Sequence, residues 1–208
     1  MTVFEAVKAR RSVRKFKSTK VPDEMIKEML ESARLAPSPG NSQGHVFGVI
    51  RNEILKQKLA EVAGGQSWIA TAPVVFACCG RLDNDIAELS EDDFSLRVNH
   101  LRFGESFIDF MKNYPDGRSR TKLFRNSAPL IPAEHIFLTA VSHGLSACFI
   151  GYLDVDKASD ILKLPEHLAC LYLLPVGYAD EEPIPKMLKP IEEMTFYDYY
   201  EDVTSRLD

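Results

Sequence analysis

The segment PVVFACC, residues 73–79, is an unbroken apolar run that contains no polar or charged side chain. A strand with one face in water alternates apolar and polar residues, whereas a strand covered on both faces reads as a continuous run. We therefore predict a strand that is buried on both faces. Outward from this run, shorter apolar stretches predict three further strands, over residues 46–50, 147–150 and 170–176.

Helical patterns fill the sequence between these strands. Thr2 and Glu5 match a capping box, in which each side chain satisfies a backbone amide at the start of a helix. Strands separated by helices indicate an α/β or an α+β fold. No internal repeat or second domain is evident, so residues 1–208 are interpreted as one domain. The further helices are predicted over residues 23–36, 53–63, 132–143 and 154–163.

The composition is typical of a globular protein with a core. The 208 residues are 45% hydrophobic and 26% charged, and the formal net charge is -5. Nucleic-acid binders are usually basic, so this balance argues against a nucleic-acid partner. No apolar run approaches the roughly 20 residues that cross a bilayer. The N-terminal sequence MTVFEAVKARRS lacks the order of a signal peptide, so we expect a cytoplasmic protein without a membrane partner.

The four cysteines, Cys78, Cys79, Cys148 and Cys170, all lie in apolar stretches. They form no CxxC motif and no spaced set with histidine, which argues against a zinc site or a disulfide framework. We interpret them as reduced, buried side chains. The alternative is a redox role for the adjacent pair Cys78 and Cys79. Neighbouring residues of a strand point to opposite faces, and this geometry disfavours that role.

A basic cluster, RRSVRKF, follows the first helix at residues 10–16. The planar guanidinium group of arginine suits bidentate binding of phosphate oxygens. Phosphate binding by this cluster is therefore one interpretation, and a solvated charged surface is the other. The candidate residues are Arg10, Arg11, Ser12 and Arg14.

A second candidate is SPGNSQ, residues 38–43, in a stretch dense in turn-forming residues. Ser38, Asn41 and Gln43 carry neutral donors and acceptors that suit the edge of a heterocycle. The alternative is a plain turn with no ligand.

Glycine ends two of the apolar strands, in FIGY (residues 149–152) and PVGY (residues 175–178). Glycine at a strand end lets the backbone approach a ligand closely, or it marks a bend. Near the C-terminus, PIPKMLKP supplies Lys186 and Lys189, which add charge to a phosphate site or lie in solvent.

No side chains are recognisable as a nucleophile with its base, as a Rossmann fingerprint or as a P-loop. If the chain is an enzyme without such groups, a cofactor would supply its reactivity. The segment 81–128 combines an acidic stretch, aromatic residues at helical spacing and a basic loop over residues 115–128. We interpret the aromatic stripe as a helix packed on the body or, alternatively, as a cover over an active site. The tail, residues 181–208, has little core of its own and is predicted to lie along another surface, such as a second subunit.

Four segments together resemble the nitroreductase family: RRSVRKF, APSPGNSQ, GLSACFIGYLD and LLPVGYADEEPIPKMLKP. The resemblance covers most of the chain except residues 81–128. It implies an α+β fold with a central, mostly antiparallel sheet surrounded by helices. It also implies a homodimer whose C-terminal tails wrap the partner subunit, with FMN bound non-covalently at the subunit interface.

The resemblance also implies roles for the candidate residues. Arg10, Ser12, Arg14 and Lys186 match positions at the phosphate and ribityl end of FMN, with Arg11 and Lys189 beside them. Ser38, Asn41 and Gln43 match positions near the ring and ribityl groups, some of them from the second subunit. The implied reaction is ping-pong hydride transfer from NADH or NADPH through FMN to a nitroaromatic, a quinone or a similar acceptor, with no catalytic side chain. Along the flavin face, the matching residues are Ile150 and Gly151.

The sequence departs from the family pattern at two places. Gly44 and His45 stand where proline and tryptophan are common, and Leu188 stands where an arginine is common. Loss of one cation is expected to weaken FMN binding by roughly 1–3 kcal/mol. Alternative functions on the same fold are reductive dehalogenation, flavin fragmentation, and a flavin-binding protein that senses or stores without turnover.

Overall fold

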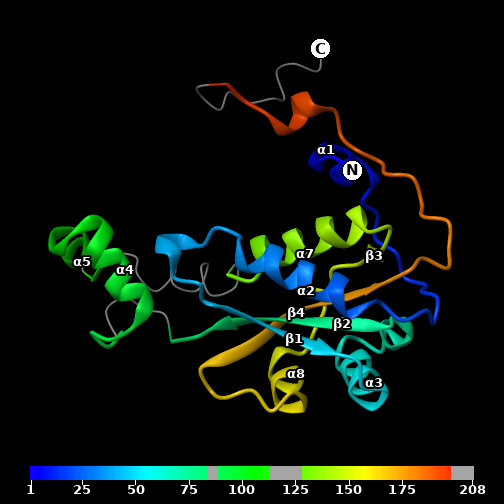
Figure 1. The fold of residues 1–208 in the computed structure, drawn as a ribbon, viewed down its shortest axis with the longest axis horizontal. Coiled ribbons are helices and arrows are strands. Elements are labelled where there is room, and N and C mark those ends of the chain that lie inside the picture. The colour runs from blue at the N-terminus through cyan, green and yellow to red at the C-terminus, as the bar shows by residue number, and fades with distance from the viewer. Residues whose placement is uncertain (84–88, 113–127, 198–208) are drawn as a thin grey trace.

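The structure, a computed structural model, describes residues 1–83, 89–112 and 128–197. In these residues the centre of the fold is a four-stranded antiparallel sheet with the strand order β1-β2-β4-β3 (Figure 1). An antiparallel sheet with helices on its faces is an α+β fold, so the α/β alternative was wrong. The strands are β1 (His45–Ile50), β2 (Val74–Arg81), β3 (Ser146–Ala147) and β4 (Leu168–Gly177).

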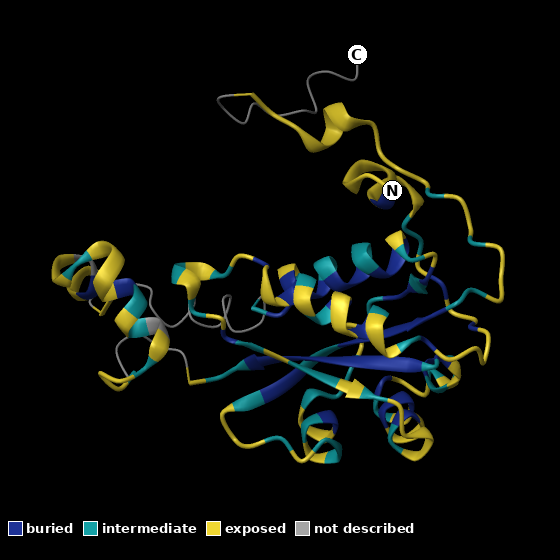
Figure 2. Ribbon diagram, in the orientation of Figure 1, coloured by how far each residue is buried: buried dark blue, intermediate teal, exposed yellow. Residues whose placement is uncertain are grey.

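Strand β2 lies in the middle of the sheet, and every residue from 74 to 80 is buried (Figure 2). Its side chains alternate between two separate core clusters. Phe76 and Cys78 belong to one cluster, and Ala77 and Cys79 belong to the other. The prediction of a strand buried on both faces is confirmed. The two adjacent cysteines point to opposite faces, as expected for a strand.

Helices cover both faces of the sheet (Figure 1). Helices α2 (Asp23–Arg34) and α7 (Leu130–Ser142) pack against each other and supply the cluster that contains Cys78. On the other face, α3 (Glu53–Val62), α8 (Val155–Ile161) and the short turn η2 (Ser67–Thr71) supply the cluster that contains Cys79.

Strand β3 is shorter than the predicted strand over residues 147–150. The cause lies in the partner strand, where Pro175 faces Cys148. Proline has no amide hydrogen, so it accepts a hydrogen bond from Cys148 but returns none. Pairing resumes at Ile150, which exchanges two hydrogen bonds of 2.9 and 3.1 Å with Leu173.

Helix α1 (Val3–Ala9) begins at the predicted capping box. The amide of Glu5 donates to the Thr2 hydroxyl at 3.2 Å, and the amide of Thr2 donates to the Glu5 carboxylate at 2.7 Å. The chain after α1 then runs along the edge of the sheet, where the Val13 amide donates to the Ala147 carbonyl at 3.1 Å. This edge contact fixes the basic segment against β3.

Helices α4 (Phe94–Phe103) and α5 (Glu105–Lys112) project from one end of the molecule (Figure 1). Phe103 and Phe110 of the aromatic stripe are 50% and 57% exposed in this chain, and both interpretations of the stripe stay predictions. The predicted basic loop lies outside the described residues up to position 127.

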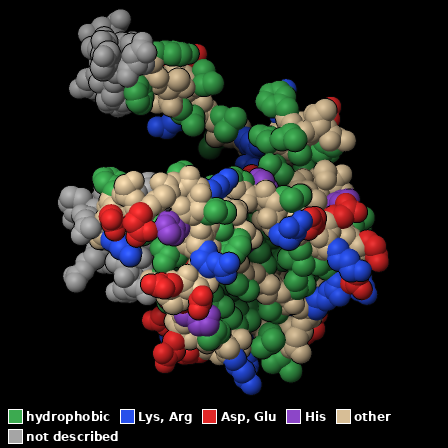
Figure 3. Space-filling model, turned by 60° about the vertical axis from the view of Figure 1, so that its left-hand side comes forward, with side chains coloured by type: hydrophobic (Ala, Val, Ile, Leu, Met, Phe, Trp, Pro, Cys, Tyr) green, Lys and Arg blue, Asp and Glu red, His purple; other side chains and the backbone are tan. Residues whose placement is uncertain are grey.

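The described part of the tail, residues 181–197, is extended except for the turn η3 (Ile191–Met194) and leaves the body past α1 (Figures 1 and 3). Its apolar side chains are largely in solvent, with Met187 at 99% exposure. None of the described helices is long and apolar enough to span a bilayer. The other exposed apolar residues of the tail are Ile184, Leu188, Ile191, Met194, Phe196 and Tyr197.

Candidate functional site

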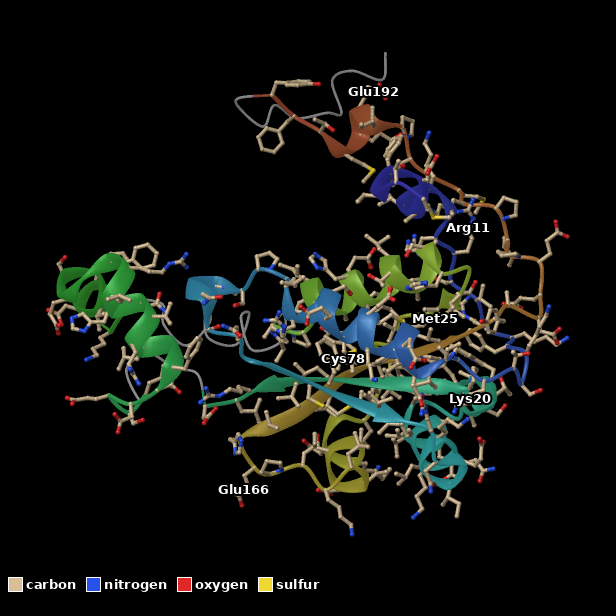
Figure 4. The ribbon with its side chains drawn as sticks, in the orientation of Figure 1. Arg11, Lys20, Met25, Cys78, Glu166 and Glu192 are labelled. Carbon is tan, nitrogen blue, oxygen red and sulfur yellow. The ribbon has the colours of Figure 1, made fainter. Side chains whose placement is uncertain are left out.

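Cationic side chains from the two ends of the chain converge at the C-terminus of α1. The Arg11 guanidinium donates to the carbonyls of Lys8 and Arg10 at 2.7 and 2.8 Å (Figure 4). The Lys186 ammonium, from the tail, donates to the Val7 carbonyl at 3.0 Å. The end of a helix presents unpaired carbonyls and a partial negative charge, which attracts both cations.

Arg10 lies beside this group and stacks over the ring of Phe137, with its guanidinium carbon 5.4 Å from the ring centroid. The pKa of the Lys186 ammonium is lowered, first by desolvation and then by the positive charges of Arg10 and Arg11. Glu134 of α7 opposes them with one negative charge. Burial raises the pKa of the Glu134 carboxyl, while Arg10 and Lys186 act in the opposite direction.

Ser12 and Arg14 extend this cluster along the sheet edge toward Cys148. Burial raises the pKa of the Cys148 thiol, and the charge of Arg14 and a hydrogen bond with Ser12 partly offset that effect. The backbone amide of Arg14 donates to the carboxylate of Glu181 at 2.5 Å. Four cations and two carboxylates therefore share this region, which leaves a net positive charge suited to an anion. We call Arg10, Arg11, Ser12, Arg14 and Lys186 the cation cluster.

The loop of residues 38–44 has a backbone conformation that the sequence alone did not predict. Gly40, Asn41 and Gln43 have φ values of 56°, 56° and 50°, in the left-handed region. The amide of Gln43 donates to the Ser38 hydroxyl at 3.0 Å, and the amide of Asn41 donates to the Ser38 carbonyl at 2.9 Å. This conformation leaves the side chains of Asn41 and Gln43 exposed.

The cation cluster and this loop lie on different elements. Arg10 stacks over Phe137 of α7, and Lys186 reaches the end of α1, whereas the loop follows α2 and contacts α4 and the end of β2. The structure therefore brings Arg10, Arg11 and Lys186 together at the end of α1, and it places Ser38, Asn41 and Gln43 on a separate loop.

A model of the nitroreductase family matches residues 7–178, which include the loop and all of the cation cluster except Lys186. The chain belongs to the nitroreductase family. It is 28% identical over 188 residues to a Thermus thermophilus protein named NADH dehydrogenase, covering 90% of this chain and 92% of the relative. It is 24% identical to the Bacillus subtilis FMN reductase [NAD(P)H], covering 99% of this chain and 78% of the relative.

The fold of this nitroreductase-family chain also matches a solved structure, the NADPH:FMN oxidoreductase from Vibrio harveyi complexed with NAD+. The TM-score is 0.75 at 22% sequence identity, covering 96% of this chain and 78% of the solved one. At this identity the likeness supports the fold alone. The fold expected from the family resemblance is confirmed, and the arrangement of the tail on a partner stays a prediction.

The two glycine motifs differ in what their surroundings require. A Cβ atom at Gly177 would lie 2.5 Å from the Pro73 ring, so the packing of this chain excludes a side chain there. A Cβ atom at Gly151 would lie 3.8 Å from the Tyr172 ring, which is ordinary contact. Gly151 is exposed and follows the buried Ile150, so its backbone is open to a ligand. Gly177 is explained by packing, and Gly151 remains a candidate for flavin contact.

Lys189 lies away from the cation cluster in this chain. Its ammonium pairs with the Glu193 carboxylate at 3.8 Å on the tail itself, four residues further along. Leu188, which stands where the family often has arginine, is 78% exposed. Of the two predicted tail lysines, the structure brings Lys186 alone to α1.

Four residues around these sites were missed by sequence reasoning. Glu134 had a weak signal, since an acidic side chain is unusual in a helix as apolar as α7. Glu181, Asn99 and Arg81 had no recognisable signal, because their partners lie far away in the sequence. Asn99 and Arg81 contact the loop of residues 38–44.

Proposed function

We propose that this chain is an FMN-dependent oxidoreductase that takes hydride from NADH or NADPH and delivers it to a small conjugated acceptor such as a nitroaromatic or a quinone. The convergence of Arg10, Ser12, Arg14 and Lys186 from the two ends of the chain carries the proposal. These are the side chains that match the phosphate-binding positions of the family.

The cation cluster fits the phosphate of FMN electrostatically. The lowered pKa of Lys186 reflects desolvation and the repulsion of neighbouring arginines, and a bound phosphate would relieve that repulsion. Arg10 is held by Phe137 and Arg11 by the carbonyls of α1, so both charges are preorganised. Preorganised charges stabilise an anion without the cost of ordering flexible side chains.

We further propose a homodimer in which FMN lies between two copies of the chain. In the proposed dimer, Asn41 and Gln43 of a second copy reach the ring of a flavin whose phosphate the first copy holds. Support comes from the exposed apolar side chains of the tail, such as Ile184 and Met187, which indicate a surface that a partner covers.

When bound, the flavin supplies the hydride chemistry, and the protein supplies binding, orientation and exclusion of water. The cation cluster would hold the phosphate end. The amides of Asn41 and Gln43 would donate and accept hydrogen bonds at the ring or the ribityl chain. The exposed backbone at Gly151 would leave room for the ring to approach the sheet. We propose a ping-pong order, in which the nicotinamide leaves before the acceptor binds in the same place.

The test is a visible absorption spectrum of the purified protein after incubation with FMN and removal of the excess, before and after anaerobic NADH or NADPH. We expect retained flavin that bleaches with at least one donor. Absence of retained flavin would refute the cofactor assignment. Flavin that is retained but does not bleach with either donor would refute the oxidoreductase and support a sensing or storage role.

A further inference from the structure

The loop of residues 38–44 is held in a strained backbone conformation. Asn41 and Gln43 adopt positive φ values that side-chain-bearing residues seldom occupy. Such conformations persist only where the surrounding structure fixes them. The contacts that fix this loop come from β2 and from α4, in the segment interpreted as a cover.

The first contact comes from Asn99, in the middle of α4. Its side chain is 8% exposed, although asparagine is mostly found at the surface. Its amide nitrogen donates to the Gly40 carbonyl at 3.3 Å. A Cβ atom at Gly40 would lie 2.5 Å from the same nitrogen, so the two residues are in close contact.

The second contact comes from Arg81, at the end of β2. Its backbone amide donates to the Gly44 carbonyl at 3.0 Å, which fixes the end of the loop. Its guanidinium pairs with the Asp93 carboxylate at 3.1 Å. Asp93 precedes α4 and accepts a hydrogen bond from the Leu96 amide at 3.4 Å, so it also orients the helix.

The two contacts are linked through α4. Asn99 binds Gly40, and α4 connects Asn99 to Asp93. Asp93 pairs with Arg81, whose backbone amide binds Gly44. The loop is therefore held at Gly40 and at Gly44 by groups that are connected to each other through α4. Asn41 and Gln43 lie between the two clamped positions.

We propose that Asn99 is a positioning residue for the flavin-contacting loop, and that α4 acts through it as a clamp on residues 38–44. This inference rests on the proposed function for the identity of the ligand. The clamp itself is a property of the chain that is testable without flavin.

The experiment uses Asn99→Ala, Asn99→Asp and, as the control, Leu101→Ala, a residue of the same helix that is 89% exposed. Asn99→Asp keeps the shape of the side chain but replaces the donor to Gly40 with an oxygen. Asp93→Asn is a second route, because it weakens the pairing with Arg81 without touching Asn99. Circular dichroism shows which variants fold.

Amide hydrogen exchange of the peptide over residues 38–44, measured without flavin, is the first readout. We expect faster exchange in both Asn99 variants and in Asp93→Asn, and wild-type exchange in Leu101→Ala. FMN affinity is the second readout, with a dissociation constant raised about 3- to 10-fold, as expected for loss of one hydrogen bond. The visible spectrum of the flavin at saturation is the third, and we expect it to change in the Asn99 variants and in Asp93→Asn but not in Leu101→Ala.

Wild-type exchange in the Asn99 and Asp93 variants would overturn the clamp. Faster exchange with unchanged FMN affinity and an unchanged flavin spectrum would overturn its positioning role. If the wild-type protein retains no flavin, the proposed function fails. Faster exchange in the variants would then still support the clamp, so the two failures are distinguishable.

Discussion

Replacement of Gly40 by alanine is expected to destabilise the protein more than a positive φ angle alone explains. Left-handed backbone at a residue with a Cβ atom costs roughly 1–2 kcal/mol. At Gly40 the added Cβ atom would also lie 2.5 and 2.8 Å from atoms of the Asn99 amide. Asn99 must then move and lose its hydrogen bond to the Gly40 carbonyl, which costs a further amount of about 1 kcal/mol. We expect a total loss of about 2–3 kcal/mol in the free energy of unfolding.

Gly65 provides the matched control, because its φ is +70° and a Cβ atom there would have no atom within 4 Å. Gly65→Ala is expected to cost the backbone contribution alone, about 1–2 kcal/mol. Urea unfolding of both variants measures the difference, and a double-mutant cycle of Gly40→Ala with Asn99→Ala assigns it. The double variant should lose less than the sum of the single changes. A Gly40→Ala variant no less stable than Gly65→Ala would refute the close contact with Asn99.

Three further predictions concern charged groups. Lys186→Ala is expected to weaken FMN binding about 10- to 100-fold through loss of a charge-assisted contact, measured by flavin fluorescence titration. Lys56 is 2% exposed and donates to the Ala72 carbonyl at 2.7 Å, so Lys56→Ala is expected to cost about 2–4 kcal/mol of unfolding free energy, measured in urea. Because the pKa of Glu134 is raised in the folded state, the stability linked to its protonated form is present below the ordinary value of 4.5 and is lost as pH rises through the raised value. Glu134→Gln should therefore stabilise the protein at neutral pH but not below pH 4.5, and denaturation at both pH values decides this.

Much of the fold could be predicted from the sequence, because its signals are local. The capping box at Thr2 and Glu5, the continuous apolar run of β2 and the helical spacing of α2 each depend on residues close together in the chain. The shortened β3 could not be predicted in this way, because its cause is Pro175 in a strand that follows after a further helix.

Part of the candidate site could also be predicted from the sequence, and part could not. The basic segment at residues 10–14 was recognisable by composition, but its meeting with Lys186 followed only from family resemblance. The contacts of Asn99 with Gly40 and of Arg81 with Asp93 had no signal, since each joins residues that the fold alone brings together. The left-handed conformation of Asn41 also lacked a distinctive signal, since asparagine tolerates it but does not require it.

The placement of the cation cluster at the end of α1 and of the flavin loop after α2 has a thermodynamic consequence in the proposed dimer. If one flavin needs the first half-site of one chain and the second half-site of another, then cofactor and partner chain act as ligands for each other. Mass action then makes flavin retention depend on protein concentration, and it makes the dimer tighter when flavin is present. Dilution of the protein should release flavin, and free FMN at the same protein concentration should restore the dimer.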